Sequence, residues 1–198
     1  KVSQDRGLIR YLMRHRHSTP FEMVEFKFHC KMPIFVARQW VRHRTANINE
    51  YSLRYSEARD EFYYPDPDNI QFQSRLNKQG RMGEVPNKLK QKVAKYFKEI
   101  SERSFEIYSE LNDEGVAREL ARAILPVNLY TEWYWKNDLH NLLHFIGLRS
   151  DSHAQYEIRV FSDAMAKSVK EVAPFAWEAY QDYIINGLKF SKVEQSIL

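Results

Sequence analysis

Hydrophobic side chains recur every three or four residues in some stretches of the chain and every second residue in others. The helical spacing covers residues 7–14, and it returns as a long amphipathic pattern from residue 89 to Gly115. Residues 24–29 and 129–135 instead alternate between apolar and polar or aromatic positions, which is the period of a strand. The pattern predicts helices for the first two stretches and strands for the other two.

Start and stop signals predict further helices. Pro33 is well placed at the start of a helix that ends at an arginine-rich stretch, and Asp138 is suited to cap another. A helix is predicted over residues 116–125, and Pro174 divides the last two helices of the chain. Because helices and strands follow one another without regular βαβ order, we predict an α+β fold with a mixed sheet flanked by long helices.

The length of 198 residues, of which 43% are hydrophobic, predicts one domain that covers residues 1–198 and buries a sizeable core. Residues 63–86 combine prolines, glycines and polar side chains. We expect this segment to be a flexible loop within the domain.

Charge and cysteine content narrow the choice of partners and location. The 30 lysines and arginines are interleaved with 26 acidic residues, which favours small anionic ligands over nucleic acid. The single cysteine, Cys30, excludes an internal disulfide and suits a reducing compartment, so we expect a structural thiol in a cytoplasmic protein. No apolar run approaches the roughly 20 residues that span a bilayer, and we expect no membrane partner.

The stretch RHRTANINEYSLRY at residues 42–55 gathers arginines, hydroxyl groups and a carboxylate. No glycine-rich phosphate loop occurs in the chain, so side chains must hold any phosphate. Arg42, Arg44 and Arg54 are candidates, because a guanidinium matches phosphate oxygens in pairs. The alternative is a solvated surface loop whose arginines pair with Glu50, Glu57 and Asp60.

His140 and His144 lie four residues apart on a predicted helix, a spacing that two metal ligands can use. Asn141 stands where a zinc-binding helix of this kind carries glutamate, and we predict no metal site. Two interpretations stay open for the pair: a polar edge that contacts a planar heterocycle, or half-buried histidines bonded to nearby carbonyls.

Arg42-His43-Arg44, followed by seven residues and Ser52, with Asn49-Glu50 and Arg54-Tyr55 inside the motif, resembles the signature of the flavin-dependent thymidylate synthases, the ThyX family. Further matching segments are HSTPFE at 17–22, PIFVARQW at 33–40, LPVNLYTE at 125–132, DLHNLLHFIGLR at 138–149 and DSHAQYEIR at 151–159. The resemblance therefore extends along nearly the whole chain.

This resemblance implies an enzyme that converts dUMP to dTMP. The family uses 5,10-methylenetetrahydrofolate as carbon donor, NADPH as reductant and FAD as hydride carrier. Its members are α+β homotetramers with active sites shared between subunits. A short segment upstream of Lys1 that the family carries is expected to be missing from this chain.

The resemblance also implies roles for individual residues. Arg149 would act on the pyrimidine as the catalytic residue, and His17 would lie on the folate or flavin route. The residues expected to bind dUMP are Gln39, Arg42, Glu50, Tyr51, Ser52, Leu53, Arg54, Arg122 and Arg149. Those expected to contact FAD are Thr19, Glu22, Arg42, His43, Arg44, Asn49, Glu50, Asp138, His140 and His144. Asn47 and Leu53 depart from the residues that the family often carries at these positions.

Two other classes of function stay open on the residues themselves. Arginines beside Tyr51 and Tyr55 suit a single-stranded nucleic-acid binding protein, since cations and stacking aromatics bind unpaired bases. A structural oligomer that buries the polar loop in a subunit interface is the third possibility.

Overall fold

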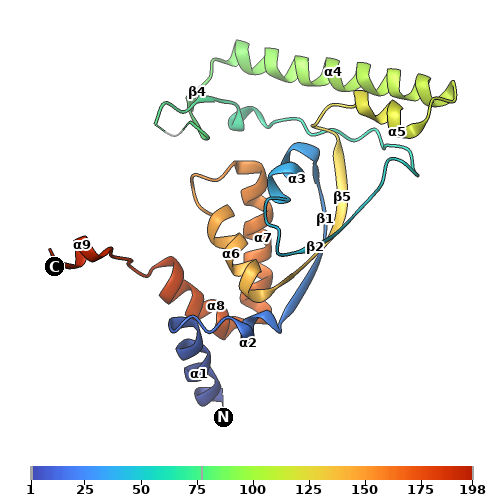
Figure 1. Cartoon of the computed structure of the whole chain (residues 1–198). Coiled ribbons are helices and arrows are strands. Elements are labelled where there is room, and N and C mark those ends of the chain that lie inside the picture. Colours follow the sequence, from blue (N-terminus) through green and yellow to red (C-terminus); the bar gives the residue numbers. More distant parts are fainter. Residues whose placement is uncertain (1, 77, 198) are drawn as a thin grey trace.

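The structure is a computed structural model that describes residues 2–76 and 78–197. Its strands are β1 (Glu25–Pro33), β2 (Asn47–Glu50), β3 (Gln71–Gln73), β4 (Arg81–Glu84) and β5 (Tyr130–Asp138). Its α-helices are α1 (Val2–Arg14), α2 (Thr19–Glu22), α3 (Ile34–Trp40), α4 (Asn87–Asp113), α5 (Arg118–Ala121), α6 (Leu139–Arg149), α7 (Tyr156–Val172), α8 (Pro174–Tyr180) and α9 (Lys192–Gln195). Short helical turns are η1 (Pro67–Asn69), η2 (Arg122–Ile124) and η3 (Gln181–Ile185). The α+β class is confirmed (Figure 1).

The main sheet has three strands in the order β1-β5-β2, and β5 is antiparallel to both neighbours. Trp135 of β5 stands between Phe28 of β1 and Ile48 of β2 in this register. The prediction of a mixed sheet is wrong for the described strands. β1 and β2 run in the same direction, but β5 lies between them and runs in the opposite direction. Every pairing in this sheet is therefore antiparallel.

The alternating pattern of β5 decides which of its side chains face the core. Trp133 and Trp135 are buried, whereas Tyr134 between them is 49% exposed. The strand predicted over residues 129–135 is confirmed as β5, which begins at Tyr130 and runs on to Asp138. One face of the sheet is therefore covered, and Figure 1 shows α6 and α7 gathered on that side of it.

Trp40, the last residue of α3, is fully buried at the centre of an aromatic cluster. Its ring meets Trp133 and Trp135 edge to face, at centroid distances of 5.5 and 5.4 Å. It stacks on Phe145 of α6 at 5.0 Å and contacts Phe161 of α7 at 5.6 Å. Such ring pairs add about 0.5–1.5 kcal/mol each beyond the burial of their surface. The cluster fixes α3, α6 and α7 on the sheet.

The predicted elements differ from the observed ones mainly where residues are polar. Helices over 7–14 and from residue 89 onward are confirmed as α1 and α4, and Gly115 follows α4 with a positive φ of 82°. The segment 63–86 contains the β3–β4 hairpin, so it is not structureless. The helix expected over 116–125 is only the short α5 and the turn η2.

No described helix combines the length and the apolar character that crossing a membrane requires.

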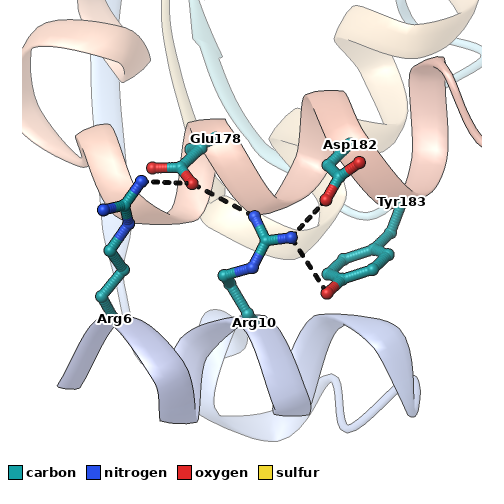
Figure 2. A network of polar contacts seen from close by, with 5 residues as sticks. All are labelled: Arg6, Arg10, Glu178, Asp182 and Tyr183. Carbon is teal, nitrogen blue, oxygen red and sulfur yellow. Dashed lines mark hydrogen bonds and ion pairs between the residues drawn. The ribbon is translucent and has the colours of Figure 1, made fainter. Parts of the chain in front are cut away.

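Helix α1 is held against the carboxyl end of α8 by a polar network (Figure 2). Arg6 and Arg10 both donate to Glu178 Oε1, at 2.7 and 3.1 Å. Arg10 also pairs with Asp182 and donates to Tyr183 Oη at 3.1 Å. Asp182 and Tyr183 belong to η3, a wider π-helical turn, which brings two consecutive side chains to the same face as Glu178. Because α1 contains no fully buried residue, this network contributes to holding it in place.

We expect Arg10→Gln to lower the midpoint of thermal unfolding, because one guanidinium bonds three partners on α8 and η3. The difference from the wild type should shrink at high salt, which screens exposed ion pairs. Arg103→Gln is the control, since Arg103 makes a local pair with Glu106 on the exposed side of α4. Equal shifts for the two variants would show that the network adds nothing to ordinary surface pairing.

Gly147 of α6 lies against Tyr180 of α8, and a Cβ at this glycine would stand 2.7 Å from the Tyr180 hydroxyl oxygen. Tyr180 is only 2% exposed and cannot move aside cheaply. We expect Gly147→Ala to destabilise the protein by about 1–3 kcal/mol, as overpacked cores do. Denaturant unfolding measures this.

The Tyr180→Phe background is the control for that substitution. It removes the clashing oxygen, which has no hydrogen-bond partner among the described residues. There the alanine should be neutral or should stabilise by up to about 1 kcal/mol through helix propensity. A loss of the same size in both backgrounds would assign the cost to some other contact.

Candidate functional site

The arginine-rich stretch begins in the turn that directly follows α3. The backbone N–H groups of Arg42 and His43 donate to the carbonyls of Gln39 and Trp40, so the turn is an extension of the helix end. Arg42 and Arg44 are exposed, while His43 between them is half-buried. Within residues 2–76 and 78–197 neither arginine forms an ion pair, which does not fit a loop paired with its own acids.

His43 joins this turn to the end of α6. Arg149, the last residue of α6, donates its Nε hydrogen to His43 Nε2 at 2.9 Å. The imidazole also contacts Phe145 edge to face at 4.8 Å and lies 6.2 Å from the ring of His144. Burial, followed by the charge of Arg149 and the neighbouring His144, lowers the pKa of His43 to about 4. His43 is therefore neutral at physiological pH and accepts a hydrogen bond from a cation.

Helix α6 carries the other candidates of this region. Asp138 caps it, accepting from the backbone N–H of Asn141 at 2.9 Å and from its side-chain amide at 2.7 Å, which confirms the predicted cap. His140 and His144 are both exposed. The interpretation of this pair as half-buried histidines is wrong, because the helix buries its leucines, Phe145 and Ile146 and turns both imidazoles outward.

Strand β2 and the following loop hold the second half of the motif. Asn49 and Glu50 lie in β2, and Glu50 accepts a 2.7 Å hydrogen bond from Thr131 of β5. The alternative of a surface loop is thus wrong for Asn47–Glu50, since pairing with β5 makes a strand of these four exposed residues.

The loop after β2 is tied to α5 rather than to α6. Arg54 pairs with Glu119 at 3.1 Å, and Arg118 pairs with Glu57 at 2.9 Å. Tyr51 donates its hydroxyl to the carbonyl of Glu57, and the Ser52 hydroxyl accepts from the backbone of Arg54. Ser52 and Leu53 are half-buried, as is Arg122 in η2. Arg54 and Arg122 therefore lie beside α5, whereas the other two phosphate candidates, Arg42 and Arg44, lie in the turn after α3.

The remaining candidates lie on two other elements. His17, just before α2, is exposed, and its ring stacks on Tyr11 at 6.2 Å. Thr19 and Glu22 begin and end α2. Gln39 is half-buried on α3, and its buried Oε1 has no hydrogen-bond partner among the described residues. A buried carbonyl oxygen without a partner fits a donor supplied by a ligand.

The structure thus brings the candidates into two separate groups. His43, His144 and Arg149 meet at the end of α6, whereas Arg54 and Arg122 lie beside α5. Figure 1 shows α5 at the far end of α4, away from α6. The two groups are therefore apart in the described part of the chain.

A network that the sequence analysis did not single out lines an open cavity of about 1130 Å³ between α4, the β3–β4 hairpin and the start of α7. Glu157, 6% exposed, accepts from Tyr63 at 2.8 Å and from Arg81 at 2.5 Å. Burial by itself would raise the pKa of Glu157, but these hydrogen bonds outweigh it and lower the pKa. The glutamate stands in the segment DSHAQYEIR, yet its partners come from distant polar residues that no local pattern marks.

Cys30 is buried on β1, and burial raises the pKa of its thiol to about 12. A thiol of this kind is not a nucleophile at physiological pH, so the structural interpretation of this cysteine agrees with its surroundings.

The structure is thus an α+β protein with one arginine group after α3 and a second, paired with acids, beside α5. The family model described as "Thymidylate synthase complementing protein" matches residues 1–175. The chain therefore belongs to that family.

The similar relatives include several named "Flavin-dependent thymidylate synthase", of which three are described. The chain is 51% identical to the one from Dictyostelium discoideum over 98% of its own length and 64% of the relative. It is 54% identical to that of Ehrlichia ruminantium (strain Gardel), over 100% of itself and 66% of the relative, and 52% identical to that of Rickettsia prowazekii, over 97% and 70%. The chain spans about two thirds of the length of these relatives.

Two similar solved structures show a UMP/dUMP methylase, PolB from Streptomyces cacaoi, bound with 5-Br dUMP or 5-Br UMP. The first has a TM-score of 0.85 at 35% identity and covers 92% of this chain and 81% of that one. The second has a TM-score of 0.85 at 36% identity, with coverage of 91% and 83%. At this identity and coverage the shared fold is secure.

The lowered pKa of His43 predicts a pH dependence of stability. Below pH 6.5, the ordinary value for histidine, the unfolded chain takes up a proton at this residue, whereas the folded chain does so only near pH 4. The contribution of the neutral imidazole to the free energy of unfolding is thus fully present above pH 6.5, and it is lost as the pH falls towards 4. We expect the free energy of unfolding to fall more steeply over this window in the wild type than in His43→Gln. Parallel pH curves for the two proteins would contradict the assignment.

Proposed function

We propose that this chain is the catalytic part of a flavin-dependent thymidylate synthase, which methylates dUMP reductively to dTMP. The carbon donor would be 5,10-methylenetetrahydrofolate and the reductant NADPH, with FAD as hydride carrier. The names of the relatives support this activity, as does the dUMP analogue in a similar structure. The comparisons give the nucleic-acid binding alternative no support. The single buried thiol of Cys30 suits a cytoplasmic location.

The observation that carries the proposal is the half-buried guanidinium of Arg149 at the end of α6. Burial lowers the pKa of Arg149, so its charge is costly to keep without an acceptor, and its neighbour His43 supplies only a neutral nitrogen. A planar ligand that gains negative charge during the reaction would complete the pair. Beside O2 and N3 of a uracil, Arg149 would favour the ionised ring and raise electron density at C5.

The residues near the turn after α3 fit a flavin nucleotide. Exposed and without ion pairs in the described chain, Arg42 and Arg44 suit its phosphates. The outward His140 and His144 can hydrogen-bond a planar ring, while the partnerless Oε1 of Gln39 is available to dUMP, the ligand expected for this residue. Bound FAD would supply hydride transfer, which none of these side chains can perform. Asn49, Thr19 and Glu22 are further contact candidates by resemblance.

The separation of the two arginine groups supports a site shared between subunits. Arg54 and Arg122, with Ser52, would hold the phosphate of dUMP, while Arg149 acts on its ring. Since Arg54 and Arg122 lie beside α5 and Arg149 lies at the end of α6 in one chain, a second copy would have to bring them together. This favours the homotetramer implied by the family, in which Glu50–Arg54 of one subunit reaches its neighbour. Arg54 would then exchange Glu119 for phosphate.

The test is the visible absorbance of the purified protein supplied with FAD, with NADPH added anaerobically before and after dUMP. We expect a flavin band that bleaches faster when dUMP is present, and dTMP as product once 5,10-methylenetetrahydrofolate is added. Parallel reactions with UMP decide which nucleotide is preferred, because the similar methylase binds analogues of both. The proposal would be overturned by a protein that retains no flavin, or by one whose flavin is reduced by NADPH at the same rate with and without either nucleotide.

Arg149→Lys should lower kcat/KM for dUMP by about 10²-fold, the loss expected when one fixed donor to a developing charge is removed. Lysine keeps the charge but not the planar fork of donors. Arg103→Lys on the exposed side of α4 is the matched control and should leave kcat/KM unchanged. Steady-state kinetics with saturating FAD provide the measurement, and an unchanged Arg149→Lys enzyme would remove this residue from the reaction.

A further inference from the structure

The hydrogen bond between Arg149 and His43 uses only one part of the guanidinium. Arginine carries five N–H donors, and the donor at Nε is the one that bonds His43 Nε2. In residues 2–76 and 78–197 no other acceptor bonds Arg149. The two terminal nitrogens, which form the fork that recognises paired acceptors, thus stay available for a ligand.

The imidazole that accepts this bond is itself fixed from two sides. Phe145 and Arg149 are four residues apart, so both project from the same face of α6, and both contact His43. Phe145 is fully buried and stacks on Trp40, which stands three residues before His43. The ring is therefore held between the aromatic core and the guanidinium.

The chemistry of the two groups sets the direction of the bond. A guanidinium has no acceptor atom, so Nε2 of His43 must be unprotonated and the ring must carry its hydrogen on Nδ1. An acceptor at Nε fixes the plane of the guanidinium, because that group is rigid and planar. Arg149 has therefore already lost, in the free protein, side-chain conformational entropy that it would otherwise lose when a ligand binds.

We propose that His43 is a positioning residue that holds Arg149 by its Nε hydrogen and presents both terminal nitrogens to the pyrimidine edge of a uridine nucleotide. This inference rests on the proposed function for the identity of the ligand. It differs from the role in FAD contact that the resemblance implies for His43. If His43 acted only on the flavin, its effect on the reaction would not depend on the hydrogen bond from Arg149.

A double-mutant cycle separates the two roles. His43→Leu removes the acceptor, His43→Gln keeps one, and Arg149→Lys keeps the charge but has no Nε–H. We expect His43→Leu to lower kcat/KM for dUMP by about tenfold or more, mainly through kcat, and His43→Gln to restore most of it. In the Arg149→Lys background, His43→Leu should cost less than about twofold further, because the bond is already absent.

The affinity for FAD, measured by flavin fluorescence, should stay the same in His43→Leu. The exposed His29 on β1, which faces Glu132 at 3.3 Å, supplies the control variant His29→Gln with full activity. Two outcomes would overturn the inference. The first is that His43→Leu lowers kcat/KM by the same factor in the wild type and in the Arg149→Lys background, and the second is that His43→Leu weakens the binding of FAD.

Nitrogen-15 NMR of labelled histidines tests the geometry without any substrate. We expect His43 to show a protonated Nδ1 and an unprotonated Nε2, and Arg149→Lys to shift these two resonances while those of His29 stay in place. If Arg149→Lys left the nitrogen chemical shifts of His43 unchanged, the inference would be overturned whatever the activity of the variant. A clear shift in a protein that fails to bind dUMP would instead overturn the proposed function and retain the coupling of the two residues.

Discussion

The packing of Trp40 against Trp133, Trp135 and Phe145 is the contact on which the rest of the structure depends. Trp40 ends α3, the two other tryptophans belong to the central strand β5, and Phe145 lies in α6. Because the ring is fully buried, the chain that leaves it has a fixed starting point on the surface. Arg42, His43 and Arg44 follow from that point, so this polar turn is anchored by a buried aromatic cluster.

This anchoring supports the proposal that side chains, and not a glycine-rich loop, hold the anionic ligand. The donors are long side chains, which need a rigid base if they are to bind with small losses of entropy. The turn after α3 and the end of α6 provide that base, and His43 joins them through Arg149. The arginines around α5 have a different setting, since their neighbours are acidic and exposed.

The sequence predicted the elements whose pattern reports burial. β1 and β5 follow from the alternation of Phe26, Phe28, Trp133 and Trp135, and α4 from its apolar stripe. β2 was not predicted because all of its residues are exposed and only hydrogen bonding to β5 makes it a strand. The motif indicated the arginines and His43, but the contact between His43 and Arg149 depends on tertiary packing that no spacing reveals. The same holds for Glu157, whose partners Tyr63 and Arg81 are far away in the sequence.

The position of β5 in the middle of the sheet governs when the protein can fold. Its partners β1 and β2 have both ended by Glu50, whereas β5 begins at Tyr130. During synthesis, both early strands must leave the ribosome without a neighbour and wait until β5 emerges, while the helix α4 can form locally in the meantime. The buried side chains of β1, Cys30 and Met32 among them, are exposed to the cell over this interval. The sheet, and with it the turn at Arg42–Arg44, can therefore assemble only late in the synthesis of each chain, after β5 has emerged.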